Sequence, residues 1–188
     1  VGFIHGVMNS DNMTISGETI DYGPCAFLDN FDLGKAFSAI DVNKRYAFGN
    51  QPAIASWNLA RFAESLLLLL DKNIEQALVI ARLELEKFKE IYQENWLEMM
   101  RKKFGLNKKC AEDLNLIKEF LQILQVNNSD YTQSFRYLAG DDLAMNFVQT
   151  VEYLAFAKSF SERLKRENIS QEERVKLMNS QNPIYIPR

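Results

Sequence analysis

The longest regular pattern in the sequence is an apolar repeat that begins at Ile74 and ends at Met99. Its members recur at spacings of three or four residues with charged residues between them, which places them on one face of an α-helix. Asn73 and Gln76 resemble a capping box at the start, and Gly105 is suited to stop the helix. The repeat predicts one long helix with apolar positions Ile74, Leu78, Ala81, Leu85, Phe88, Tyr92, Trp96 and Met99.

Similar but shorter patterns fill most of the chain after Asn50. Asn50 is suited to cap a helix that carries Pro52 near its start and continues to Leu70. Residues 51–188 are therefore expected to form an α-helical body. Its further helices are expected from Cys110 to Leu124, over 131–138 after a Ser129–Asp130 cap, from Asp141–Asp142 to Leu164, and after a capping box formed by Ser170 and Glu173.

The N-terminal region has a β pattern instead. Residues 13–16 and 19–20 read as two short strands, and the Gly17–Glu18 pair between them suits a two-residue type II′ turn. Pairing through this turn makes Asn12 a diagonal neighbour of Asp21 on one face of the hairpin. An amide oxygen and a carboxylate are ligands that Mg²⁺ accepts together with nucleotide phosphates, so the pair is a candidate metal site.

A plainer interpretation of these residues is turn chemistry, because Asn, Asp, Ser and Gly are the usual turn formers. Taken alone, Asp11–Asn12 and Asp21 would each favour that interpretation. The hairpin that brings Asn12 and Asp21 to one face favours a functional site.

Composition sets broad limits on the chain. Its 188 residues suffice for one hydrophobic core, and a net charge of −3 without a basic stripe argues against binding to nucleic acid. The longest apolar run, Leu66 to Leu70, is too short to cross a bilayer, and no signal peptide is recognisable. The two cysteines, Cys25 and Cys110, are far apart, which favours free thiols in a reducing, cytoplasmic compartment.

Residues 5–12 and 21–23 resemble two motifs of protein kinases. The kinase catalytic loop reads H-R-D-L-x-x-x-N and precedes D-F-G, and here His5 and Asn12 keep the spacing while Asp21-Tyr22-Gly23 follows. Val7 occupies the position of the kinase base and cannot accept a proton. A chain that keeps the metal-binding pair without that base is typical of a pseudokinase.

The same stretch is similar to the selenoprotein O (SelO/YdiU) family, whose motifs H-G-V-M-N-[TS]-D-N-M and D-Y-G-P it matches almost letter for letter. The resemblance covers essentially the whole chain. Further matches are Arg45-Tyr46, Asn50-Gln51-Pro52-Ala53, Trp57-Asn58-Leu59, Ser129-Asp130-Tyr131-Thr132, Phe135-Arg136 and Asn182-Pro183.

The resemblance implies a mainly α fold with a short N-terminal β-hairpin, the C-lobe portion of a protein-kinase-like fold. Residues 1–188 would form a single partial domain that lacks the N-lobe, with its Gly-rich loop and Lys–Glu pair. Within it, residues 1–23 would be the catalytic loop and metal-binding hairpin, 24–50 an activation-segment-like loop and 51–188 the helical body.

The function that the resemblance implies is protein adenylylation, in which AMP moves from ATP to Ser, Thr or Tyr hydroxyls of proteins. Asp11 would be the catalytic proton acceptor, Asn12 a ligand of Mg²⁺ or Mn²⁺, and Asp21 a metal ligand that also contacts ATP. UTP is an alternative nucleotide. We expect ATP and protein substrates as partners, no nucleic acid or membrane, a cytoplasmic location (mitochondrial for a eukaryotic parent), and no activity from this fragment alone.

Two alternative functions correspond to parts of the sequence pattern. A helical interaction module with a vestigial nucleotide site would bind its partner without ATP. A small-molecule phosphotransferase is disfavoured, because Val7 replaces the Asp that such enzymes also use. His5 is the only histidine and could be a general base, but in kinase-like loops this position braces the backbone, so a structural role is favoured.

Overall fold

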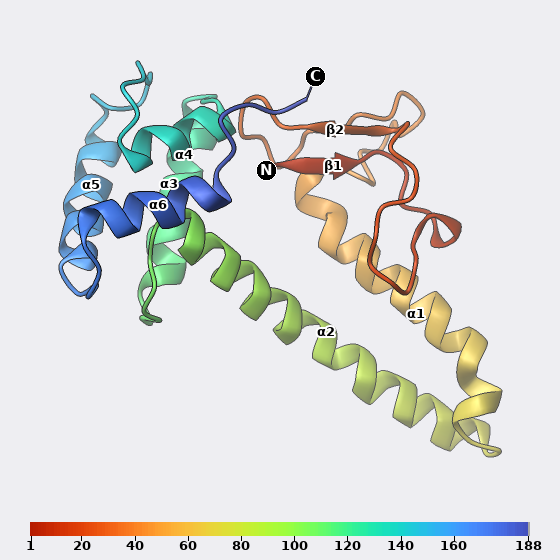
Figure 1. The fold of residues 1–188 in the computed structure, drawn as a ribbon. Coiled ribbons are helices and arrows are strands. Elements are labelled where there is room, and N and C mark those ends of the chain that lie inside the picture. Colours follow the sequence, from red (N-terminus) through yellow and green to blue (C-terminus); the bar gives the residue numbers. More distant parts are fainter. Residues whose placement is uncertain (188) are drawn as a thin grey trace. The chain divides into compact units, whose positions relative to one another are not determined.

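The computed structural model describes residues 1–187, which form a mainly helical chain with a pair of short strands near its N-terminus (Figure 1). This confirms the predicted fold class at the level of its secondary structure. The elements are β1 (Phe3–His5), the 3₁₀ turn η1 (Ser10–Asn12), β2 (Cys25–Phe27), the 3₁₀ turn η2 (Phe48–Asn50), α1 (Gln51–Leu70), α2 (Ile74–Lys103), α3 (Asp113–Val126), α4 (Tyr131–Ala139), α5 (Val151–Leu164) and α6 (Gln171–Gln181).

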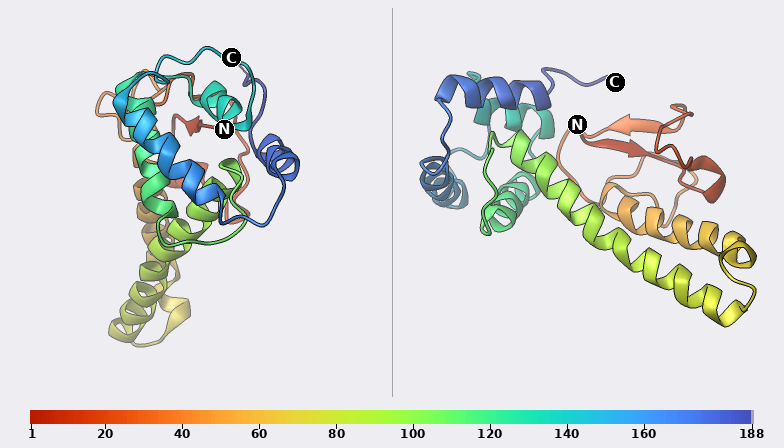
Figure 2. Two further views of the ribbon diagram at one scale, coloured as in Figure 1. Left: turned by 90° about the vertical axis from the view of Figure 1, so that its left-hand side faces the viewer. Right: turned by 60° about the horizontal axis from the view of Figure 1, so that its bottom comes forward.

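Contacts group the chain into two compact units. The loop unit contains residues 3–26 and 33–95, and the helical unit contains residues 1–2, 27–32 and those from Trp96 onward. In the loop unit α1 and the first part of α2 run side by side as a helical hairpin (Figure 2). In the helical unit α3 packs on α5 and α4 packs on α6.

The two strands are not where the sequence pattern placed them. β1 pairs with β2, and the backbone N–H of Gly6 donates to the carbonyl of Pro24 at 2.6 Å beside this antiparallel pair. Residues 13–16 and 19–20, predicted as strands, form no ladder. That prediction was wrong because Ile15 and Ile20 are 93% and 72% exposed. Without an apolar face to bury, a two-stranded hairpin gains too little to form in water.

A turn replaces the predicted hairpin loop. The N–H of Gly17 donates to the carbonyl of Thr14 at 3.2 Å, and the Thr14 hydroxyl donates to the carbonyl of Glu18 at 3.1 Å. Gly17 has φ of +71°, a left-handed conformation that glycine adopts without steric cost. The turn-forming residues of this stretch therefore make turns, as the plainer interpretation predicted. The strands β1 and β2 lie before and after the stretch in the sequence.

Most predicted helices are confirmed, with one clear exception. α2 begins at Ile74 after an Asn73 side chain that accepts the N–H groups of Glu75 and Gln76, and the Ser170–Glu173 capping box is present on α6. The helix predicted from Asp141–Asp142 does not begin until Val151.

That helix starts late because the Asp141 carboxylate is already occupied. Arg136 donates to it from Nε at 2.7 Å and from the terminal nitrogen Nη2 at 3.1 Å. Thr150 caps α5 instead, and its hydroxyl accepts the N–H of Tyr153 at 3.2 Å. Capping by Asn50 also failed, because its side chain donates to the carbonyl of Lys44.

The segment Phe48–Leu70 is long and apolar enough to cross a membrane, judged by its length and its mean hydropathy of 1.3 alone. Its middle carries Arg61 and Glu64, which form an ion pair, and the amide of Asn58, which bonds to a neighbouring loop.

A buried cation lies in the core of the helical unit. Lys103 is 3% exposed, and its Nζ donates to Asn182 Oδ1 at 2.6 Å and lies 4.1 Å from the centre of the Phe135 ring and 5.3 Å from that of Tyr131. Among residues 1–187 no carboxylate is within ion-pair distance of it. Burial therefore lowers the pKa of Lys103 to about 8.

We expect the unfolding free energy to rise between about pH 8 and pH 10, because the unfolded chain then binds a proton that folded Lys103 has released. The full effect is on the order of 3 kcal/mol. Burial raises the pKa values of Tyr131 and Tyr153, which lowers stability only above about pH 10.

Urea unfolding of the chain at several pH values between about 8 and 10 measures this rise in the unfolding free energy. Lys103→Met should remove the rise and increase stability at pH 7. Lys102→Met is the matched control, since Lys102 is exposed and pairs with Glu98 on the surface. An unchanged pH slope in Lys103→Met would contradict the assignment.

Candidate functional site

The candidate site is built on the loop that follows β1. This loop has only one regular piece, the 3₁₀ turn η1, in which the N–H of Asn12 donates to the carbonyl of Asn9 at 2.9 Å. The Asn12 side chain turns back and donates from Nδ2 to the carbonyl of Val7 at 3.3 Å. Asp11, on the same turn, is exposed. The turn thus points one carboxylate outward and uses the neighbouring amide to hold its own backbone.

His5 connects this loop with the segment that carries Asp21. The N–H of Val7 donates to His5 Nδ1 at 3.3 Å, so Nδ1 is the unprotonated acceptor. Nε2 then carries the hydrogen and donates it to the backbone carbonyl of Asp21 at 2.9 Å. Both ring nitrogens are occupied by backbone groups, which supports the bracing role expected for His5 over a role as general base.

The two predicted metal ligands are therefore connected by consecutive hydrogen bonds, from Asn12 to Val7, from Val7 to His5 and from His5 to Asp21. The Asp21 side chain is exposed, and its Oδ1 accepts the N–H of Gly23 at 2.8 Å. This bond fixes the direction of the carboxylate and leaves its other oxygen available.

Within residues 1–187 no group of three His, Cys, Asp or Glu side chains could hold a metal ion. One carboxylate and one amide oxygen suit a hard cation such as Mg²⁺, which takes most of its ligands from phosphates and water. The donor set of Asn12 and Asp21 thus fits a nucleotide-borne magnesium ion better than an ion held by protein alone.

A cleft of about 200 Å³ lies beside the loop. Asn12 lines it, whereas Asp11 and Asp21 are not part of its wall. Its lining is formed by Phe3, His5, Met8, Asn12, Met13, Thr14, Gly17, Glu18, Thr19 and Gln51.

Asn58 on α1 is a residue of the site that sequence reasoning missed. It is 5% exposed, and its Nδ2 donates to the carbonyl of Met8 at 3.0 Å and to Met13 Sδ at 2.6 Å. Its Oδ1 is buried and has no hydrogen-bond partner among the described residues. The amide thus fastens both ends of the loop that carries Asp11 and Asn12. The sequence contains a signal for the burial of Asn58, because it lies four residues after Ile54 and therefore on the same, buried face of the helix.

Residues 41–51 brace the loop from another side. The Tyr46 hydroxyl donates to Asn9 Oδ1 at 2.6 Å, and Gln51 Nε2 donates to the carbonyls of His5 and Tyr46 at 3.0 and 3.2 Å. The Asp41 carboxylate accepts the N–H groups of residues 45 and 46, which fixes the position of Tyr46. Asp41 and Tyr46 lie in residues 24–50, the segment predicted to resemble an activation loop, and Gln51 is the first residue of α1.

A family model described as protein adenylyltransferase SelO matches residues 1–188. The chain belongs to this family. The motifs around His5, Asn12 and Asp21 had indicated this membership before the fold was known, and the match confirms it.

The curated relatives include proteins named protein nucleotidyltransferase YdiU. Over 189 aligned residues the one from Geobacillus kaustophilus (strain HTA426) is 48% identical, and the one from Clostridium botulinum (strain Eklund 17B / Type B) is 50% identical. The one from Clostridium beijerinckii (strain ATCC 51743 / NCIMB 8052) is 49% identical. Each alignment covers 100% of this chain but only 38–39% of the relative. The chain thus spans about two fifths of the length of these relatives.

We expect Asn58→Ala to lower the unfolding free energy by about 1–3 kcal/mol, because it leaves the partly buried carbonyl of Met8 without its donor. Urea unfolding measures this loss. Asn95→Ala is the matched control, because Asn95 lies on α2, is exposed and bonds only within its own helix. Equal effects of the two substitutions would contradict the anchoring role.

His5 is the only histidine, so its tautomer can be measured without ambiguity. We expect the ¹⁵N resonances of the ring to show a protonated Nε2 and an unprotonated Nδ1 at a pH well above the usual titration range of histidine. A proton on Nδ1 would show that the bridge between Val7 and Asp21 is absent.

Proposed function

We propose that this chain carries the metal- and nucleotide-holding part of a protein adenylyltransferase, which moves AMP from ATP to Ser, Thr or Tyr hydroxyls of proteins. The observation that carries the proposal is the hydrogen-bonded connection of Asn12, His5 and Asp21, in a member of a family of nucleotidyltransferases. The finer interpretation of the fold, a kinase-like C-lobe that works with an N-lobe, belongs to this proposal.

The reaction is a displacement at the α-phosphorus of ATP. The oxygen of the acceptor hydroxyl forms a bond to this phosphorus, the bond from phosphorus to the oxygen of the β-phosphate breaks, and pyrophosphate leaves with the electron pair. Asp11 accepts the proton of the hydroxyl, a role for which its exposed side chain on η1 is accessible.

Asn12 and Asp21 would hold Mg²⁺ or Mn²⁺ together with the phosphates. When bound, the ion supplies positive charge that stabilises the phosphate oxygens as the leaving group departs. The Gly23 N–H keeps the Asp21 carboxylate in one direction, and His5 keeps its backbone in place. Transfer of this kind depends mainly on positioning and on neutralisation of charge.

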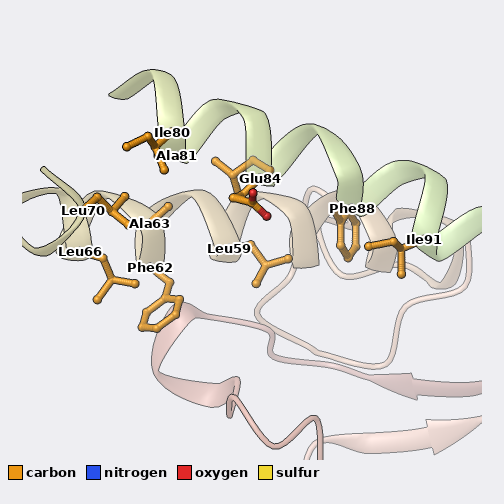
Figure 3. A pocket seen from close by; sticks show the side chains of 11 residues that line it. Leu59, Phe62, Ala63, Leu66, Leu70, Ile80, Ala81, Glu84, Phe88 and Ile91 are labelled. Atoms are coloured by element: carbon orange, nitrogen blue, oxygen red, sulfur yellow. The ribbon is translucent and has the colours of Figure 1, made fainter. Parts of the chain in front are cut away.

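A second function, a helical interaction module with a vestigial nucleotide site, is favoured by one feature. An apolar groove of about 360 Å³ lies between α1 and α2, lined from both helices by side chains such as Leu59, Phe62 and Phe88 (Figure 3). A groove of this kind is suited to receive an apolar helix. This function requires no nucleotide, so ATP dependence separates it from transfer.

We expect Asp21→Ala to abolish transfer, because it removes the only carboxylate of the proposed metal pair. The experiment uses the longest natural polypeptide that contains the chain, with Mg²⁺ or Mn²⁺ and ATP labelled at either the α- or the γ-phosphorus. Protein-bound label from the α position alone is the expected result.

Asp71→Ala is the matched control for this experiment. Asp71 is partly buried, and its Oδ1 accepts the N–H two residues later at 2.7 Å, as in Asp21, but it lies at the end of α1. It should leave transfer unchanged. Near-normal α labelling by Asp21→Ala would overturn the proposed role of that residue, and label from the γ position alone would indicate a kinase.

A further inference from the structure

Two arginines lie against one exposed tryptophan in the loop unit. The guanidinium carbon of Arg45 is 4.9 Å from the centre of the Trp57 ring, and that of Arg61 is 5.3 Å from it. Trp57 is 43% exposed. Cation–π attraction over these distances restrains the guanidinium groups while leaving N–H donors at their edges free for a ligand.

This cluster borders the loop that carries Asp11. Arg61 and Ser10, the residue before Asp11, line the same cavity of about 330 Å³. On the other side, Tyr46 follows Arg45 in sequence and donates its hydroxyl hydrogen to Asn9. Both arginines are therefore placed next to η1 by contacts that belong to the site.

The charges around the cluster leave it able to bind an anion. Within the part of the chain that the structure describes, no carboxylate lies within ion-pair distance of the Arg45 guanidinium. The Asp41 carboxylate nearby accepts backbone N–H groups. Arg61 pairs with Glu64 at 2.5 Å, but both side chains are about half exposed. Such a pair contributes little stability, so a ligand carboxylate can replace Glu64 at small cost.

We propose that Arg45, Trp57 and Arg61 form a docking surface for an acidic segment of the protein substrate, beside its acceptor hydroxyl. The inference deepens the proposed function, on which it rests, because it names the substrate class of the same site. Each planar guanidinium can bind a carboxylate through two parallel hydrogen bonds, and Trp57 adds apolar contact area between them. The chain itself has a net charge of −3, so the attraction to an acidic segment is local to this surface.

The test compares short synthetic peptides that carry one hydroxyl residue flanked by Glu, by Gln or by Lys. Transfer from ATP is measured with the longest natural polypeptide that contains the chain, and binding of each fluorescently labelled peptide is measured separately by anisotropy. The variants are Arg45→Gln and Arg61→Gln, with Arg45→Lys as the conservative substitution. Arg82→Gln is the matched control, an exposed arginine on α2 that does not lie over the Trp57 ring as Arg45 and Arg61 do.

We expect the Glu peptide to be preferred and its binding to weaken as salt rises. Each Gln substitution should raise the KM for the Glu peptide by about fivefold to tenfold at unchanged kcat, and should leave the KM for ATP unchanged. Arg45→Lys should recover part of the loss, because lysine keeps the charge but not the paired hydrogen bonds. Arg82→Gln should have no effect.

Failure of this inference can be distinguished from failure of the proposed function. Transfer to all three peptides with equal efficiency would overturn the docking surface while nucleotidyl transfer stands. A raised KM for ATP in the Gln variants would assign the arginines to the nucleotide and would also overturn it. Salt-sensitive binding of the Glu peptide without transfer would support the docking surface and contradict the proposed function.

Discussion

The hydrogen bond from the buried Asn58 amide to the carbonyl of Met8 is the contact on which the candidate site depends most. The loop after β1 has almost no regular structure, so its backbone groups need partners from elsewhere. Asn58 supplies one from α1 and the His5 ring a second from the end of β1, while Gln51 at the start of α1 donates to the carbonyl of His5, where the loop begins. The loop therefore takes its shape from a rigid helix, which is what a site needs to hold its side chains in place.

The sequence predicted the helices well because their signals are local. The α2 repeat, the Asn73 cap and the Ser170–Glu173 box each depend on residues within one or two turns, and each is found. The errors arose where another group competed for a residue that gives a local signal, or where no apolar surface supported the pattern. Asp141 resembles a helix start, but Arg136 binds its carboxylate, and the strand pattern around Ile15 has no partner surface to cover it.

The arrangement of the predicted site residues could not be read from the sequence. Asn12 and Asp21 were expected to meet across a hairpin, whereas the structure connects them through His5 and Val7. Asn58 was absent from the expected site because its spacing from Ile54 indicates burial but does not tell that it contacts a loop about fifty residues earlier. Motif spacing indicates which residues belong together, and only the fold shows which contacts hold them.

The groups that hold the loop are neutral, and this has an electrostatic consequence. A carboxylate in place of Asn58 could not donate to the carbonyl of Met8, and its buried charge would be costly. The Asn58 amide and the His5 ring fix the backbone through hydrogen bonds to backbone groups, and the exposed carboxylates of Asp11, Glu18 and Asp21 lie around the turn. Arg45 and Arg61 then provide cationic groups at its border, bound to Trp57 by attraction that needs no carboxylate. Under the proposed function, this separation lets the acidic groups attract a metal ion and the arginines attract an anionic segment of the substrate.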